Sequence, residues 1–172
     1  MKTFRCIICG EVFIGERRPA NCPFCGVPAR YMKETAKVDG SKIFLVKKLS
    51  DESRKNLMAA LNLETSNASF YQCASEKSET EELRIIFKRL ARIENEHANV
   101  ISRYLGLDSV ELQVEECSNV DGENLTVAKE RESHALEFYK QAMAEARESK
   151  IASFFRALID VEEGHLEIVK KF

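Results

Sequence analysis

Residues 94–97 read ENEH, and residues 162–165 read EEGH. The same Glu-x-x-His pattern therefore occurs twice, 68 positions apart, in a chain of 172 residues. Residues three apart lie on one face of a helix, so each Glu and His pair points in a single direction. One such tetrapeptide is common on charged helices, but two in one short chain raise the hypothesis of a shared metal site.

The similarity extends well beyond the two tetrapeptides. Residues 50–97 align with residues 118–165 without a gap. Helix-start, apolar and polar positions all coincide: Ser50 with Ser118, Glu64 with Glu132, Phe70 and Tyr71 with Phe138 and Tyr139, Phe87 with Phe155, Glu94 with Glu162, and His97 with His165. Shared composition alone does not produce a common register, so the chain contains two copies of a helical hairpin.

No proline follows Pro28, and long helices require its absence. The apolar periodicity predicts helices over residues 51–75, 78–105, 120–148 and 149–171. Ser78 and Glu81 form a candidate capping box for the second helix, which we expect to end before Gly106. The connection 106–117 would reach about 40 Å if extended, which is long enough to run along a bundle. The predicted fold class is an all-α, ferritin-like four-helix bundle with one long crossover.

Each hairpin contributes one Glu from its first helix and a Glu-x-x-His pair from its second. The combined set is Glu64, Glu94, His97, Glu132, Glu162 and His165. Its ligand count and helix distribution match those of dinuclear carboxylate proteins. Four carboxylates also balance two divalent cations, and oxygen and nitrogen ligands suit iron or manganese, with zinc as an alternative. The competing interpretation is solvated glutamates and ordinary histidines, which the repeat disfavours.

Two tyrosines follow the first-helix glutamates at equivalent positions. Tyr71 and Tyr139 lie seven residues after Glu64 and Glu132, which is two helical turns along the same face. We expect each hydroxyl to support a ligand carboxylate through a hydrogen bond. The alternative is an aromatic core residue whose hydroxyl is satisfied elsewhere.

Four of the six cysteines lie within two short knuckles at the N-terminus. CIICG (6–10) and CPFCG (22–26) place Cys6, Cys9, Cys22 and Cys25 in a pattern typical of a tetrahedral metal site. Zinc and iron both suit four thiolates, and a neighbouring redox-active centre favours iron. We expect Cys73 and Cys117 to be small buried hydrophobes, because nothing in their spacing indicates a pair. Residues 36–49 are expected to be a linker with a short strand over Lys42–Lys47.

The bulk properties exclude several function classes. The net charge is −2, whereas nucleic-acid or membrane surfaces attract proteins with a basic excess. No apolar run approaches the roughly 20 residues that span a bilayer. The first residues, MKTFRCIICG, lack an apolar signal region, so we expect a cytoplasmic protein without nucleic-acid or membrane partners.

A pair of cysteine knuckles followed by a bundle carrying E…ExxH…E…ExxH resembles the rubrerythrin family over essentially the whole chain. The knuckles come first here, which resembles the reverse-order members. The resemblance implies a rubredoxin-like domain over residues 1–35, the linker over 36–49, and a ferritin-like di-iron bundle over 50–172.

The resemblance also implies a non-haem di-iron peroxidase that reduces hydrogen peroxide to water. The four knuckle cysteines would hold one iron, the six bundle residues would hold a di-iron centre, and Tyr71 and Tyr139 would support the ligands. Glu94 and Glu162 are candidates for the bridging carboxylates. Electrons would come from a rubredoxin or an NAD(P)H-dependent reductase. A head-to-tail homodimer is expected, on the reasoning that the knuckles lie too far from the bundle centre of their own chain.

One position departs from the family pattern. Rubrerythrins typically carry an extra glutamate about one turn after the third-helix ligand, where this chain has Ala135 beside His134. Either His134 substitutes for that glutamate or the redox-linked ligand exchange is absent. The alternatives to a peroxidase are an oxygen-reducing oxidase and a ferroxidase or other iron-handling protein.

Overall fold

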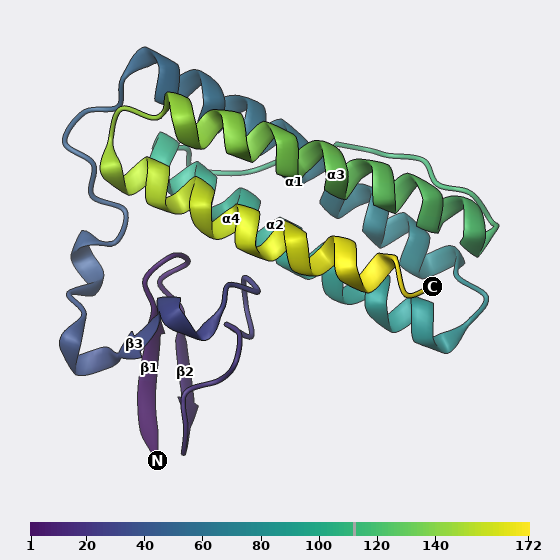
Figure 1. The fold of residues 1–172 in the computed structure, drawn as a ribbon, viewed down its shortest axis with the longest axis horizontal. Helices are drawn as coiled ribbons and strands as arrows, with labels where there is room; N and C mark the ends of the chain where they lie inside the picture. The colour runs from purple at the N-terminus through teal and green to yellow at the C-terminus, as the bar shows by residue number, and fades with distance from the viewer. Residues whose placement is uncertain (112) are drawn as a thin grey trace.

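Four long helices form a bundle that follows a small N-terminal module of strands (Figure 1). The structure is a computed structural model that describes residues 1–111 and 113–172. The helices are α1 (Asp51–Lys77), α2 (Glu81–Leu105), α3 (Asp121–Glu145) and α4 (Ser149–Val169). The predicted fold class is confirmed, with two hairpins joined by one long connection.

The caps explain where the helices of the first hairpin begin and end. The hydroxyl of Ser50 accepts a hydrogen bond from the Ser53 N–H and starts α1. At α2 the capping residue is Thr80, whose hydroxyl accepts from the Leu83 N–H at 3.3 Å. The predicted capping box at Ser78 is therefore wrong. Ser78 ends α1 instead, and its hydroxyl donates to Asp121.

The third helix ends three residues earlier than predicted. Its C-cap is Ala146, and Glu148 is already extended. The Glu148 carboxylate accepts a hydrogen bond from the backbone N–H of Ser50 at 2.6 Å and another from the Ser53 hydroxyl. This carboxylate therefore joins the turn between α3 and α4 to the start of α1, and the contact favours a turn over a further helical residue.

The N-terminal module is built on a three-stranded antiparallel sheet. Its strands are β1 (Lys2–Cys6), β2 (Val12–Gly15) and β3 (Met32–Glu34), in the order β2-β1-β3. Each knuckle ends in a glycine with a left-handed backbone, Gly10 at φ 85° and Gly26 at φ 77°. Glycine adopts this conformation without steric cost, which lets the chain turn sharply after each cysteine pair.

The linker does not contain the predicted strand. Short 3-10 helices occupy Thr35–Lys37 and Gly40–Lys42, another at Ala29–Tyr31 precedes β3, and no strand covers residues 42–47. The carbonyls of Lys42 and Leu45 accept hydrogen bonds from the Lys150 side chain rather than from a neighbouring strand. The apolar residues that suggested a strand instead pack on the bundle, as Phe44 does against Tyr104 with ring centroids 5.5 Å apart.

The module and the crossover lie against different helices of the bundle. In Figure 1 the strands and knuckles lie beside α4 and α2, while the connection after α2 runs along α1 and α3. The buried residues of the knuckles share one hydrophobic cluster with part of the bundle, and the rest of the bundle core, around Phe70 and Phe87, forms a second cluster. None of the helices that the structure describes is both long enough and apolar enough to cross a membrane.

Candidate metal centres

The four knuckle cysteines converge in a buried cluster. Their side chains are all buried, and their sulfur atoms lie within 4.8 Å of one another. The sulfur of Cys6 lies 3.7 Å from that of Cys25, and the sulfur of Cys9 lies 3.8 Å from that of Cys22. A metal about 2.3 Å from each of four sulfurs at tetrahedral angles requires sulfurs about 3.8 Å apart. The cluster therefore has the dimensions of a four-thiolate metal site.

The second candidate centre lies inside the bundle, where the two Glu-x-x-His pairs face each other. Nδ1 of His97 lies 3.1 Å from Glu94, and Nδ1 of His165 lies 3.0 Å from Glu162. The two imidazole rings are nearly parallel, at 20°, with centroids 6.4 Å apart. The 68-residue repeat in sequence is thus a repeat in space, with one pair contributed by α2 and the other by α4.

The ligand candidates form two overlapping groups. One group contains Glu64, Glu94, His97 and Glu162, and the other contains Glu94, Glu132, Glu162 and His165. Glu94 and Glu162 belong to both groups, and each has an oxygen within 4 Å of both imidazoles. Two metals placed in these groups would share Glu94 and Glu162, which is the arrangement expected of bridging carboxylates.

Each tyrosine reaches across to the other hairpin. The Tyr139 hydroxyl donates to Glu64 at 2.5 Å, and the Tyr71 hydroxyl donates to Glu132. Both tyrosines are fully buried, and burial raises the pKa of both hydroxyls well above 10, so they remain donors. Each hydrogen bond joins α1 to α3 and fixes one oxygen of Glu64 or Glu132. The second oxygen of each carboxylate is free to turn toward the centre of the bundle.

The remaining carboxylate oxygens show that the bundle cluster fits a metal pair. Among the residues described, one oxygen each of Glu64, Glu94, Glu132 and Glu162 is buried without a hydrogen-bond partner. Buried carboxylates without partners are costly unless they are paired with protons or cations. Four acceptors and two imidazole nitrogens around one point are therefore a donor set for two hard divalent cations.

In the absence of metal, protons must replace those cations. Burial raises the pKa of Glu64 to about 8. Burial and the charges of Glu94 and Glu132 also raise the pKa of Glu162. Although burial favours neutral imidazoles, the surrounding carboxylates raise the pKa of both histidines well above 6.5. Metal binding must therefore release protons from this centre.

The knuckles touch the bundle centre of their own chain. Nε2 of His97 lies 2.9 Å from the backbone carbonyl oxygen of Cys25, so a protonated Nε2 donates to it. The Nδ1 atom of the same ring faces the carboxylates. The reasoning that the two centres lie too far apart within one chain is therefore wrong. One imidazole connects them directly.

Several contacts that the sequence did not reveal hold the module in this position. Asp160 of α4 accepts a hydrogen bond from the Tyr31 hydroxyl at 2.7 Å and pairs with Arg30. On α2, Arg103 donates to the carbonyl of Cys9 and Arg89 donates to that of Pro23. The side chains that make these contacts are charged or aromatic groups of the kind usually found on surfaces. Their role depends on a domain contact that periodicity within one helix cannot show.

Gly26 allows the second knuckle to approach the bundle closely. A Cβ atom at this position would lie 3.1 Å from Val161 of α4 and 3.6 Å from Ile93 of α2. Glycine therefore serves two purposes here: it permits the positive φ angle, and it leaves room for the neighbouring helices. This contact places Cys25 next to His97.

The structure also shows the surroundings of the position that lacks the family glutamate. Ala135 is fully buried in α3, while the adjacent His134 is exposed and lines a pocket on the outer surface. His134 consequently does not substitute for the missing carboxylate. Of the helical glutamates outside the candidate ligand set, Glu130, Glu137 and Glu163 are exposed, but Glu96 is half-buried. Burial, together with the charge of Glu11, raises the pKa of Glu96.

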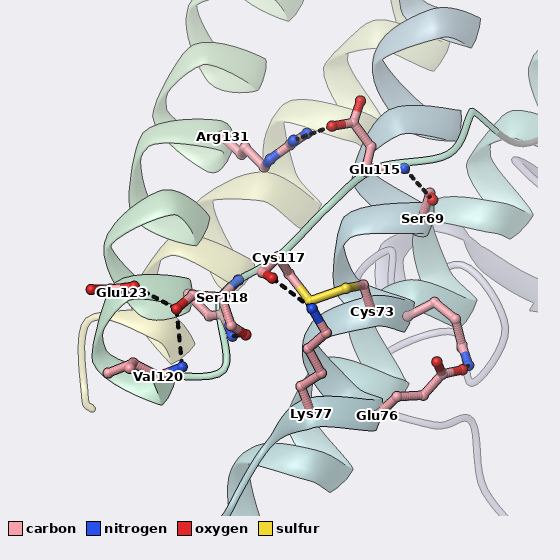
Figure 2. The surroundings of a disulfide bond; sticks show 12 residues. Ser69, Cys73, Glu76, Lys77, Glu115, Cys117, Ser118, Val120, Glu123 and Arg131 are labelled. Carbon is pink, nitrogen blue, oxygen red and sulfur yellow. Dashed lines mark hydrogen bonds and ion pairs between the residues drawn. A yellow bond between two sulfur atoms is a disulfide. The ribbon is translucent and has the colours of Figure 1, made fainter.

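The remaining two cysteines are bonded to each other. Cys73 of α1 and Cys117 form a disulfide with Cα atoms 5.9 Å apart (Figure 2). The prediction that they are unpaired buried hydrophobes is wrong, and both are half-buried. Their separation of 44 residues spans a helix and the crossover, so spacing alone could not show that the chain returns to α1.

Comparison with known proteins finds two matching family models. The family model described as Rubrerythrin matches residues 55–172, and the model described as Rubrerythrin, rubredoxin-like domain matches residues 4–33. Reverse rubrerythrin-1 of Clostridium acetobutylicum is 30% identical over 114 residues, which cover 62% of this chain and 63% of that relative. The match thus spans less than two thirds of the relative's length. No solved structure matches.

Proposed function

Because this chain belongs to the rubrerythrin family, we propose that it is a non-haem di-iron peroxidase that reduces hydrogen peroxide to water. The observation that carries the proposal is the 2.9 Å contact between His97 and the Cys25 carbonyl. It joins a site suited to one-electron transfer with a site suited to two-electron chemistry. The name of the Clostridium relative and its reverse order of domains support the same assignment.

In this proposal Cys6, Cys9, Cys22 and Cys25 hold one iron, and the six bundle residues hold two. When bound, the iron pair supplies the two electrons that, with two protons, convert peroxide to two water molecules, and the knuckle iron returns electrons one at a time. The two groups of candidate ligands would hold one metal each, and Glu94 and Glu162 would be the carboxylates common to both. The remaining roles belong to side chains of the chain itself.

The tyrosines and histidines orient the ligands. Tyr71 and Tyr139 each donate to one oxygen of Glu132 and Glu64 from the opposite hairpin, which holds the carboxylate in place and leaves its second oxygen for a metal. His97 presents Nδ1 to the carboxylates and Nε2 to Cys25. With a metal at Nδ1, the ring would therefore be held in one orientation and one tautomer, with the proton on Nε2.

The electron route in this proposal lies within one chain. The path from the Cys25 sulfur runs through its own backbone to the carbonyl oxygen, across one hydrogen bond to Nε2 of His97, and through the ring to Nδ1. We propose that an external reductase or rubredoxin donates to the knuckle iron. A homodimer remains a prediction, but this route does not require one.

A stopped-flow experiment tests the peroxidase activity. The metal-loaded protein is reduced without oxygen and mixed with hydrogen peroxide or with dissolved oxygen, while the absorption of the oxidised cysteine-bound iron is followed. Faster return of the band with peroxide supports the proposal. Faster return with oxygen supports an oxygen-reducing oxidase, the alternative favoured by the buried Ala135 in place of an acidic residue. A protein that never shows the band has no iron in its knuckles.

A mixing experiment tests whether electrons pass within one chain. One variant, Cys22→Ser, disables the knuckle site, and a second, Glu162→Ala, disables the bundle centre. Neither variant alone should couple knuckle oxidation to peroxide. If the route lies within one chain, an equimolar mixture of the two, unfolded and refolded together, should remain inactive. Recovery of peroxide-driven knuckle oxidation in the mixture would show a route between chains and contradict the proposal.

A further inference from the structure

The crossover is fastened to the bundle at its C-terminal end. Cys117, near the end of this connection, is bonded to Cys73 on α1, and the Lys77 ammonium donates to the Cys117 carbonyl at 2.8 Å (Figure 2). Two residues earlier, the backbone N–H of Glu115 donates to the Ser69 hydroxyl at 3.0 Å. The disulfide therefore reinforces a segment that already contacts α1 through two hydrogen bonds.

The same segment is also held to α3. The Glu115 carboxylate pairs with Arg131 at 3.0 Å and accepts a hydrogen bond from Ser66 at 2.6 Å. These contacts do not include a sulfur atom. After reduction these contacts would still favour a position of Cys117 beside Cys73, although the segment would open more often than it does with the disulfide in place. The reduced cysteines can consequently form the disulfide again without a large rearrangement of the crossover.

Beneath this segment lies a pocket on the outer side of the helices that carry Glu64 and Glu132. It has a volume of about 360 Å³, and its lining includes Gln113 of the crossover with Asn67, Arg131 and His134. Asn67 is 3% exposed, it accepts from Arg131 at 3.1 Å, and its Nδ2 has no partner among the residues described. Gln113 of the crossover thus forms one edge of a pocket that combines these polar groups with the apolar side chains of Leu63 and Phe138.

We propose that Cys73 and Cys117 form a third redox site, a reversible dithiol–disulfide couple that fastens the crossover over this pocket. Its oxidant is a hydroperoxide and its reductant is a dithiol, either a small molecule or a protein. The pair lies on the α1 side of the bundle, whereas the knuckles lie beside α2 and α4. The couple is therefore separate from both metal centres, and it requires no particular substrate at either of them.

The oxidation balances with the two thiols alone. One cysteine loses its proton and attacks a peroxide oxygen as the thiolate, the O–O bond breaks, and the departing hydroxide takes up that proton, so that a sulfenic acid and one water form. The second thiol attacks that sulfur, the S–O bond breaks, and the disulfide and a second water form. Two electrons pass from sulfur to peroxide. In the reverse direction a dithiol reductant attacks the disulfide, becomes a disulfide itself and returns two thiols to the protein.

Two features of the pair favour a reversible bond over an inert structural one. Both cysteines are half-buried, so they lie nearer to solvent than the fully buried knuckle cysteines. The Lys77 ammonium lies at the Cys117 carbonyl, where its positive charge favours an attacking or departing thiolate. The knuckle thiols differ in both respects, because they are buried and belong to a metal site.

The experiment uses the metal-loaded full chain, in which the knuckle cysteines are protected by their metal. The protein is treated with a dithiol under native conditions, and free thiols are alkylated and located by mass spectrometry. Label should appear at Cys73 and Cys117. One equivalent of hydrogen peroxide added before alkylation should abolish both labels and restore the disulfide. Failure of the dithiol to open the bond in the folded protein, or oxidation to sulfinic acid, would overturn the proposal.

A second measurement follows the crossover itself. Hydrogen exchange of the Glu115 amide should be roughly tenfold faster or more in the dithiol form than in the disulfide form, because this amide opens with the segment. The variant Cys73→Ser/Cys117→Ser should show the faster rate under both conditions. Cys117→Ser alone should trap a sulfenic acid at Cys73 after peroxide. Equal exchange rates in the two forms would contradict a fastening role for the couple.

Discussion

At the scale of single residues, the bundle centre depends on groups that do not contact metal. The hydroxyl of Tyr139 donates to Glu64 from the opposite hairpin. Removing such a supporting donor commonly lowers metal affinity or activity by about 10- to 100-fold. The Tyr139→Phe variant should therefore bind ferrous ion at the bundle centre about 10- to 100-fold more weakly than the wild type. Anaerobic titration with ferrous ion measures this affinity.

Tyr104→Phe is the matched control for that variant. Tyr104 is also buried, but it packs among Phe44 and Phe154 rather than against the carboxylates. Removal of the Tyr104 hydroxyl should leave the affinity for ferrous ion at the wild-type value. Equal weakening in both variants would mean that the Tyr139 effect comes from packing and not from its hydrogen bond.

The protonated carboxylates and histidines predict an unusual pH dependence for the metal-free protein. The pKa of Glu64 is raised from 4.5 to about 8, and those of His97 and His165 are raised well above 6.5. The folded state then binds more protons than the unfolded chain between pH 6.5 and 8. Folding stability must fall as the pH rises through this window.

Thermal unfolding measures this effect directly. The metal-free protein should melt at a lower temperature near the folded-state pKa of Glu64, about 8, than near the ordinary histidine pKa of 6.5. The metal-loaded protein should lose less or gain stability over the same range, because metal replaces the protons. A metal-free protein that melts at a higher temperature at the upper end of this range would contradict the raised pKa values.

At the scale of the elements, two glycines test the helix boundaries. Gly106 ends α2 in a left-handed conformation at φ 70°, whereas Gly164 lies within α4, and a Cβ added at either position would have no atom within 4 Å. Alanine at Gly106 should destabilise the protein by about 1–2 kcal/mol through backbone strain. Alanine at Gly164 should stabilise it by roughly 0.5–1 kcal/mol. Urea unfolding of the two variants should therefore shift in opposite directions.

Most of the bundle could be predicted from the sequence because its signals are periodic and repeated. The gap-free repeat identifies both hairpins, and it places Glu64 and Glu132 as equivalents although neither belongs to a local motif. The helix starts were less secure, since Ser78 and Thr80 are both good caps and only the packing of α1 decides between them. Local sequence patterns thus predict the presence of the helices more accurately than the residues at which they begin and end.

Contacts between distant segments could not be predicted in this way. The disulfide depends on where an irregular crossover returns to α1. The docking of the knuckles depends on backbone carbonyls of Cys9 and Cys25, which every residue possesses and which therefore leave no mark in the sequence. The apolar linker residues resembled a strand because packing on a helical surface and packing in a sheet both select large hydrophobic side chains.

At the scale of the whole molecule, one carboxylate connects the module to α4. Asp160 accepts from Tyr31 and pairs with Arg30, and hydrogen bonds to charged groups contribute about 1.5–3 kcal/mol. The Asp160→Ala variant should dock its knuckles less tightly. Its knuckle iron should be oxidised more slowly by peroxide, while the iron content of both sites stays unchanged.

Glu167→Gln provides the control, since Glu167 lies exposed on the same helix. It should leave the stopped-flow rate at the wild-type value. Limited proteolysis gives a second readout, because a loosely docked module should expose the linker over residues 36–49. An Asp160→Ala protein with wild-type kinetics and protease resistance would show that the other contacts suffice for docking.

The single contact between His97 and Cys25 breaks the equivalence of the two halves of the bundle. The repeat supplies matching residues to both metal positions, yet the knuckles touch only one imidazole, and Nε2 of His165 has no partner among the residues described. Of the two metal positions that the repeat supplies, the one at His97 thus lies near the knuckles and the one at His165 lies farther from them. In an iron-loaded sample, Mössbauer spectra should resolve two inequivalent ions, and asymmetry of this kind gives an arriving electron a preferred first acceptor.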